Sequence, residues 1–267
     1  MGTKTKIDWC DSTWNPVTGC RHDCAYCYAR KIAERFGGVN YEDELENRYG
    51  EYDVVRLHAE EDVHELDRPI ADFYSGKKAP YPWEFDPTFH RYRLDEPKRW
   101  KKPHTIFVCS MSDLFGDWVP DEWIEQVFRA CEAAPQHRYL FLTKNPKRYV
   151  ELYGNGILRV RDSFWYGSTI TGANEPFFFS RMPDDNPHTF CSIEPILEPV
   201  GTVQEMSDWV IVGAETGNRR GKVVPQKEWI DEIAAECKRH RKPLFMKDSL
   251  RGLMGDDFKQ EFPWEVK

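Results

Sequence analysis

The sequence lacks the long hydrophobic runs that membrane-spanning helices need. No stretch of about 18 consecutive apolar residues occurs in it, so no transmembrane helix is expected. Residues 1–8 carry no apolar core of the kind found in secretory signal peptides. We therefore expect a cytoplasmic protein without a membrane partner.

The chain also lacks net positive charge, since 45 acidic residues outnumber 37 Lys and Arg and the formal net charge is −8 at pH 7. Affinity for the phosphates of a nucleic acid comes from clustered Lys and Arg, so an acidic chain binds nucleic acid poorly without a specific site. Internal repeats and low-complexity stretches are absent as well. These features favour an ordinary globular protein over a repeat array or a non-specific nucleic-acid binder.

A second paired cysteine motif is missing. The chain has eight cysteines, and those at positions 10, 109, 131, 191 and 237 are isolated among mostly apolar neighbours. In a reducing compartment cysteines do not form a disulfide framework, so we predict that these five behave as small core residues. Cys20, Cys24 and Cys27 alone lie close together.

What the sequence does contain is a series of short apolar runs that read as strands, several of them followed by a helical pattern. Strands that are apolar throughout are typical of a parallel sheet covered on both faces, and alternation with helices favours right-handed βαβ units. Helices are predicted from about 28 to 36, from about 121 to before Pro135, and from about 226 to 239, and Asn145-Pro146 predicts another helix start. The predicted strands are 13–18, 104–110, 138–143, 164–169, 188–193, 208–213 and 243–247.

The predicted fold class is therefore α/β, a partial or complete TIM-like (βα) barrel of six to seven parallel strands. We expect residues 1–267 to form a single domain. Residues 39–103 form a long insertion rich in aromatic, acidic and proline residues. A connection of that length is usually functional or separately folded, so we interpret it as a lid or a side subdomain.

The cysteine cluster has the spacing C-x₃-C-x₂-C. Close spacing lets three thiolates bind one inorganic cluster, and cysteine thiolates are the usual ligands of 4Fe–4S clusters. Three ligands leave one iron without a protein donor, and S-adenosylmethionine (SAM) can chelate that iron through its amino and carboxylate groups. The alternative is zinc, with Cys10 or His22 as fourth ligand, although structural zinc sites normally show two paired ligand motifs.

The loop resembles the signature of the radical SAM superfamily, including an aromatic residue, Tyr26, directly before the third cysteine. Further segments make the chain similar to a phage- and prokaryote-associated family of largely unknown function, itself distantly similar to spore photoproduct lyase. These segments are 14–20, 111–115, 142–146, 192–195 and 212–217. The resemblance spans nearly the whole chain and implies a radical SAM barrel with a 4Fe–4S cluster and SAM as cofactors. It supplies no substrate.

Polar residues follow most of the predicted strands, and in a TIM-like barrel the chemistry lies at the C-terminal strand ends. By the resemblance, Ser110, Ser112 and Asp113 are candidates to hold the SAM ammonium, although the familiar Gly-Gly-Glu form is absent there. Glu194 and Glu215 are candidates for the ribose or the substrate, and Lys144 and Lys247 for anionic groups. The candidates for cofactor binding are Tyr26, Ser110, Ser112, Asp113, Thr143, Lys144, Ser168, Glu194 and Glu215.

A basic loop follows the sixth predicted strand, and its Arg, Lys and Gly residues suit phosphate. We hypothesise a nucleotide or nucleic-acid substrate and a flavodoxin- or ferredoxin-type electron donor. Two other readings stay open: a non-catalytic Fe–S or zinc protein that binds nucleic acid, and a metal-dependent TIM-barrel hydrolase. The candidate substrate residues are Arg219, Arg220, Lys222, Lys247 and Asp248.

Overall fold

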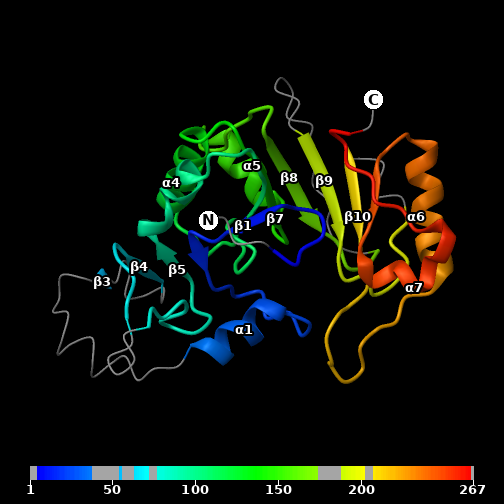
Figure 1. Ribbon diagram of the computed structural model, residues 1–267, viewed down its shortest axis with the longest axis horizontal. Coiled ribbons are helices and arrows are strands. Elements are labelled where there is room, and N and C mark those ends of the chain that lie inside the picture. The colour runs from blue at the N-terminus through cyan, green and yellow to red at the C-terminus, as the bar shows by residue number, and fades with distance from the viewer. Residues whose placement is uncertain are drawn as a thin grey trace. The chain divides into compact units, whose positions relative to one another are not determined.

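A sheet of seven strands dominates the fold, in the order β1-β6-β7-β8-β9-β10-β11 (Figure 1). The computed structural model describes residues 5–37, 54–55, 63–71, 77–173, 188–201 and 207–265. Neighbouring strands pair in parallel, and the predicted partial TIM-like barrel is confirmed. The strands are β1 (Ser12–Trp14), β6 (Thr105–Val108), β7 (Arg138–Thr143), β8 (Phe164–Thr169), β9 (His188–Ile193), β10 (Trp209–Val212) and β11 (Leu244–Met246).

The chain divides into two compact units. The first contains residues 1–4 and 12–139, and the second contains residues 5–11 and 140–267. The helices are α1 (Tyr28–Phe36), α3 (Glu96–Arg99), α4 (Asp121–Glu132), α5 (Lys147–Gly154), α6 (Lys227–Arg239) and α7 (Arg251–Met254), with 3₁₀ helices η1 (Arg91–Arg93), η3 (Asp248–Leu250) and η4 (Gly255–Asp257). None of these described helices is long and apolar enough to span a membrane.

The first predicted strand, residues 13–18, is split in two. β1 belongs to the large sheet, whereas β2 (Val17–Thr18) belongs to a four-stranded sheet of order β2-β5-β4-β3. The break falls at Asn15-Pro16. Proline has no amide hydrogen to donate to a ladder, and the Asn15 side chain instead accepts a hydrogen bond from the Met111 amide at 3.0 Å. Sequence periodicity does not reveal this change of sheet, because neither half, Ser12–Trp14 or Val17–Thr18, is long enough to show a pattern.

The predicted insertion, residues 39–103, supplies the rest of the small sheet. Its strands are β3 (Val54–Val55), β4 (His64–Leu66) and β5 (Thr88–His90). Buried Glu65 of β4 forms an ion pair with Arg91 and accepts a hydrogen bond from the indole of Trp123 on α4. Residues 39–53, 56–62 and 72–76 lie outside the described residues, so the interpretation as a lid or side subdomain stays a prediction.

In the second unit, α6 lies beside β10 (Figure 1). Its residues Ile230, Ile233 and Cys237 pack with Val210 and Val212 of β10 in one buried cluster. Side chains alternate along a strand, so one face of β9, β10 and β11 meets α6. The other face carries an aromatic group in which Trp209 contacts Phe190 and Phe245. This division decides which strand-end side chains can lie together.

Candidate metal centre and polar strand ends

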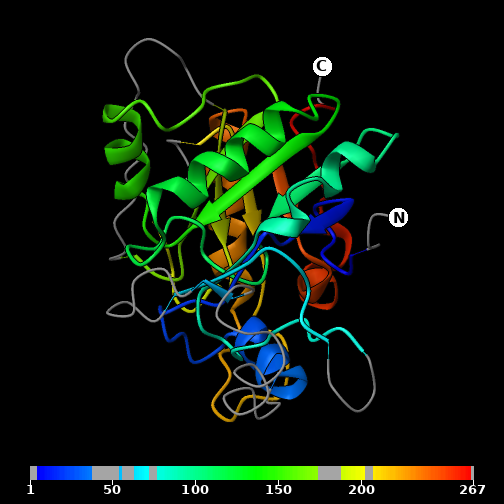
Figure 2. The same ribbon diagram turned by 90° about the vertical axis from the view of Figure 1, so that its left-hand side faces the viewer.

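The cysteine loop lies between β2 and α1 in the first unit, and α1, drawn in blue, follows it directly (Figures 1 and 2). The Cys27 amide donates to the Cys24 carbonyl at 3.0 Å, which closes a turn. The Cys27 thiol caps α1, because its Sγ accepts a hydrogen bond from the Arg30 amide at 3.3 Å. The last cysteine is therefore fixed to a helix N-terminus, where orphan amides favour a negative ligand.

The Cys24 and Cys27 thiols both influence the Cys20 thiol. Burial, with smaller contributions from Asp113, Cys24 and Cys27, raises the pKa of the Cys20 thiol to about 12. Cys20 and Cys27 also pack against the same apolar cluster, which includes Ala33, Phe85 and Met111. A nearby metal cation would favour the thiolates instead, because it reverses the sign of the local field.

Among the residues that the structure describes, no three His, Cys, Asp or Glu side chains are grouped as a bound metal ion needs. The donor set nevertheless suits a 4Fe–4S cluster, because one loop carries three partly exposed thiols, and two of them, Cys20 and Cys27, pack against an apolar cluster. Cys109, Cys131, Cys191 and Cys237 are buried, which confirms their predicted role as core residues, whereas Cys10 is half-buried.

The loop is attached to the segment that follows β6. The Gly19 amide donates to the Met111 carbonyl at 3.0 Å, and the Tyr28 hydroxyl donates to the Ser110 carbonyl at 2.5 Å. His22 Nε2 lies 2.7 Å from Asp113 Oδ2. The residues before, within and after the cysteine cluster thus all bind residues 110–113.

The three residues predicted to hold the SAM ammonium, Ser110, Ser112 and Asp113, each have a hydrogen-bond partner in the first unit. Ser110 Oγ donates to the Asn15 side chain at 3.2 Å, and Ser112 Oγ donates to the Val17 carbonyl at 3.1 Å. Asp113 is buried, and its Oδ1 accepts the Phe115 amide at 3.0 Å. The assignment of this segment to SAM therefore stays a prediction, and the structure adds a contact with the cysteine loop. Sequence reasoning missed Asn15 and Tyr28, although both flank the loop.

In the second unit, Glu194 and Lys247 form an ion pair. The other carboxylate oxygen of Glu194 accepts hydrogen bonds from the Trp9 indole at 3.2 Å and from Ser192 Oγ at 3.1 Å. Burial lowers the pKa of the Lys247 ammonium, but Glu194 and, more weakly, Asp8 and Cys10 raise it further, so the net shift is upward. Lys247 is therefore a charged, paired lysine and not a neutral base.

Gly213 at the end of β10 makes room for this pair. A Cβ atom at that position would lie 2.8 Å from Lys247 Cδ and 3.2 Å from Glu194 Oε1. The Gly213-Ala214-Glu215 sequence thus has a steric reason for its glycine. The sequence predicted Glu194 and Lys247 as separate candidates, and the structure brings them together.

Glu215 is held by the basic loop that follows it. Arg219 donates to Glu215 through Nε at 2.6 Å and through Nη2 at 2.7 Å, a bidentate ion pair. The hydrogen bond from Arg219 is the main cause of a lowered pKa for the Glu215 carboxyl. Arg220 and Lys222 lie on the exposed part of the loop. Arg219, predicted for the substrate, therefore already has an internal partner.

The remaining residues predicted for the site each have their own surroundings. Ser168 is fully buried, its Oγ has no hydrogen-bond partner in the described structure, and it aligns with Cys191 of the α6-facing cluster. Thr143 is also buried, and its Oγ1 accepts the Asn145 amide at 2.9 Å. Asp248 accepts a hydrogen bond from Arg251 at 2.6 Å. Lys144 and Tyr26 are half-buried. Ser168 therefore lies on the face of the sheet that meets α6.

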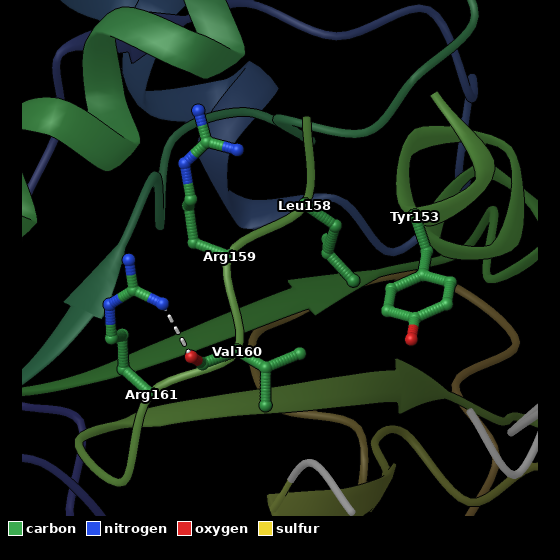
Figure 3. Close-up of a pocket in the computed structure, with 5 residues that line it drawn as sticks. All are labelled: Tyr153, Leu158, Arg159, Val160 and Arg161. Atoms are coloured by element: carbon green, nitrogen blue, oxygen red, sulfur yellow. Dashed lines mark hydrogen bonds between the residues drawn. The ribbon is translucent and has the colours of Figure 1, made fainter. Parts of the chain in front are cut away.

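A surface cavity of about 340 Å³ also lies in the second unit, lined by Tyr153, Leu158, Arg159, Val160 and Arg161 (Figure 3). Its arginines bind backbone carbonyls: Arg159 Nη1 lies 2.5 Å from the Gly156 oxygen, and Arg161 Nη1 lies 2.8 Å from the Val160 oxygen. Among the described residues that line this cavity, none was predicted from the sequence as a site residue.

The sequence profile of a family described as a protein of unknown function, DUF5131, matches residues 4–251. The chain belongs to the DUF5131 family. Among solved structures, this DUF5131 protein is similar to a mutant of spore photoproduct lyase, with 12% sequence identity and a TM-score of 0.48. That alignment covers 92% of this chain and 79% of the other. No curated protein matches the chain.

Proposed function

We propose that this DUF5131 protein is a radical SAM enzyme. The observation that carries the proposal is the loop of Cys20, Cys24 and Cys27: Cys24 and Cys27 both act on the Cys20 thiol, Cys20 and Cys27 pack against one apolar cluster, and Cys27 caps a helix. Cys20, Cys24 and Cys27 would hold three irons of a 4Fe–4S cluster, and SAM would take the fourth. When bound, the cluster supplies one electron that breaks a carbon–sulfur bond of SAM, giving methionine and a 5′-deoxyadenosyl radical.

The residues of the chain bind and orient the reactants. SAM presents an ammonium, a carboxylate and a ribose, which need acceptors and donors. In the second unit, Glu194 and Lys247 together offer a carboxylate and an ammonium. Glu215, kept ionised by Arg219, is a second carboxylate for a ribose or a substrate.

The electron must come from a partner, for which we propose a carrier of the flavodoxin or ferredoxin type. Helix α1 begins at the cysteine loop, and its exposed surface carries Lys31 and Arg35 beside Ile32 and Phe36. A basic surface with exposed apolar side chains suits a small acidic carrier, because complementary charge speeds the encounter. This surface stands out on a chain whose net charge is −8.

We propose an anionic substrate of nucleotide or nucleic-acid class. Arg220 and Lys222 support it, because both are exposed on a loop in which Gly217 and Gly221 take positive φ angles of 87° and 75°. Such glycines allow tight turns that present backbone amides as well as side chains to phosphate.

Anaerobic reconstitution tests the proposed function directly. The purified chain is incubated with iron and sulfide, desalted, and assayed for metal, sulfide, and 5′-deoxyadenosine after addition of SAM and dithionite. We expect about four irons and four sulfides per chain, and 5′-deoxyadenosine that depends on the reductant. One bound zinc, no sulfide and no SAM cleavage would instead support a zinc protein or a hydrolase.

A further inference from the structure

The contact between His22 and Asp113 joins the cysteine loop to the segment that follows β6. His22 is placed between Cys20 and Cys24 in the sequence, and Asp113 follows β6, 91 residues away. Their side chains meet at 2.7 Å, with Asp113 only 5% exposed. A buried carboxylate is costly unless it is bonded, and here one oxygen binds His22 while the other binds the Phe115 amide.

The imidazole is restrained on a second side. The ring of Trp118 meets the ring of His22 edge-on, with centroids 4.9 Å apart. A side chain held by a carboxylate and by an aromatic edge has little rotamer freedom left. The backbone between Cys20 and Cys24 is thereby fixed to the segment after β6, while Gly19 and Tyr28 fix its two flanks.

We infer that His22 and Asp113 are positioning residues, a latch that orders the cysteine loop for cluster assembly. This inference rests on the proposed function. In this inference Asp113 acts by holding His22 and not by binding SAM. His22 acts by holding the loop and not as a metal ligand, because its Nε2 is directed to Asp113. Neighbours that orient ligands without touching the metal typically contribute ten- to a hundredfold in metal affinity.

The test compares the parent with His22→Ala, His22→Gln, Asp113→Ala and the double variant His22→Ala/Asp113→Ala. His240→Ala is the matched control, because His240 is exposed at the end of α6 and pairs with Glu236. Each protein is reconstituted, and the rate at which a chelator removes iron is measured. Hydrogen exchange over residues 19–28 is measured in each apoprotein, together with its melting temperature.

We expect the chelator to remove iron about ten to a hundred times faster from His22→Ala and Asp113→Ala than from the parent. The double variant should lose iron no faster than either single variant, because each single substitution already removes the same His22–Asp113 contact. His22→Gln should recover part of the loss, since its amide can still donate to Asp113. The loop of the alanine variants should exchange faster while the melting temperature changes little, and His240→Ala should match the parent.

Parent-like iron retention and parent-like exchange in His22→Ala would overturn the latch. An Asp113→Ala protein that keeps its iron but no longer binds SAM would also overturn it and would assign Asp113 to SAM. A parent chain that takes up no iron would instead refute the proposed function. The loop exchange of the apoprotein would still report whether the contact orders the loop, so the two failures are distinguishable.

Discussion

Among single residues, the cysteines occupy two distinct environments. Cys109, Cys131, Cys191 and Cys237 are fully buried, and burial is the main cause that raises the pKa of the Cys237 thiol to about 12. A neutral thiol in an apolar core is a poor nucleophile and a poor metal ligand. The loop cysteines, in contrast, are partly exposed, although burial raises the pKa of the Cys20 thiol to a similar value, so exposure and close spacing distinguish the loop.

Cys24→Ala should therefore lose the reconstituted cluster, because one of its three protein ligands is gone. Iron and sulfide should fall to background levels, and SAM cleavage should disappear with them. Cys131→Ala is the matched control, since it removes a thiol from α4 without touching the loop. A Cys24→Ala chain that binds iron and cleaves SAM like the parent would refute the ligand assignment.

The ion pair of Glu215 predicts a dependence of stability on pH. Arg219 lowers the pKa of Glu215 below its ordinary value of 4.5. Between the lowered pKa of the folded state and about pH 4.5, the unfolded chain therefore binds more protons than the folded chain. The ion pair stabilises the fold fully above about pH 4.5, and this stabilisation is lost as the pH falls through the pKa of the folded state. The melting temperature of the parent should exceed that of Glu215→Gln near neutral pH.

The difference in melting temperature between the parent and Glu215→Gln should shrink below about pH 4.5. Thermal unfolding measured from about pH 7 to about pH 3 tests this expectation. Arg219→Ala should show the same convergence, because it removes the other partner. A difference between parent and variant that stays constant over the whole range would show that Glu215 acts through packing and not through its charge.

Among the elements, α1 lies where two of the proposed functions meet, cluster binding and docking of the electron donor. Ala29 and Ala33 face the core, whereas Ile32 and Phe36, one turn apart, are 37% and 58% exposed. Residues four apart share a face, so the helix presents an apolar stripe flanked by Lys31 and Arg35. Its N-terminus is capped by a predicted cluster ligand, Cys27.

Lys31→Glu/Arg35→Glu should slow cluster reduction by a flavodoxin- or ferredoxin-type donor by about tenfold or more at low salt, because steering by charge contributes about that much to encounter rates. Reduction by dithionite should be unchanged, since this small reductant needs no docking surface. Stopped-flow absorbance measures both rates. Lys238→Glu/Arg239→Glu on α6 is the matched control. Equal rates for both double variants would exclude α1 as the docking surface.

For the whole molecule, the net charge of −8 limits how a polyanion can bind. Each neutralised phosphate releases counterions, so the salt dependence of affinity counts the phosphates that are contacted. The exposed cations of the basic loop are Arg220 and Lys222, because Arg219 is engaged with Glu215. Few phosphate contacts, and a shallow salt dependence, are expected.

Arg220→Ala/Lys222→Ala should weaken binding of a nucleotide by about tenfold or more, because a charge-assisted hydrogen bond contributes about 1.5–3 kcal/mol. Titrations of a mononucleotide, a single strand and a duplex at two salt concentrations measure this effect. Lys101→Ala/Lys102→Ala, which removes the same charge from another exposed segment, serves as control. If no nucleotide binds the parent, or the loop variant binds like the parent, the substrate class is wrong.

Most elements could be read from the sequence because their signals are local. Helix α4 begins at Asp121 as expected, and α6 covers Lys227–Arg239 against a predicted 226–239. The helix predicted to begin at Pro146 starts one residue later, with Pro146 as its cap. The first predicted strand was an exception, because Asn15-Pro16 divides it between two sheets.

The candidate site was less readable. Proximity of the three cysteines is a matter of spacing, and the sequence shows it. Ser168 and Glu194 look alike as polar strand ends, yet Ser168 aligns with a residue of the α6-facing cluster while Glu194 pairs with Lys247. Which face a side chain occupies depends on the register of its strand, and a shift of one residue exchanges the faces.

The sequence by itself determined the α/β class, the run of seven strands, the buried cysteines and the cysteine loop, because hydrophobic periodicity and close spacing act over a few residues. Only the tertiary structure decided that His22 meets Asp113, that Glu194 meets Lys247, and that Arg219 is taken by Glu215. The first two pairs join residues far apart in the chain, and the third depends on how a loop turns. Such contacts follow from the packing of strands and loops, which no local pattern encodes.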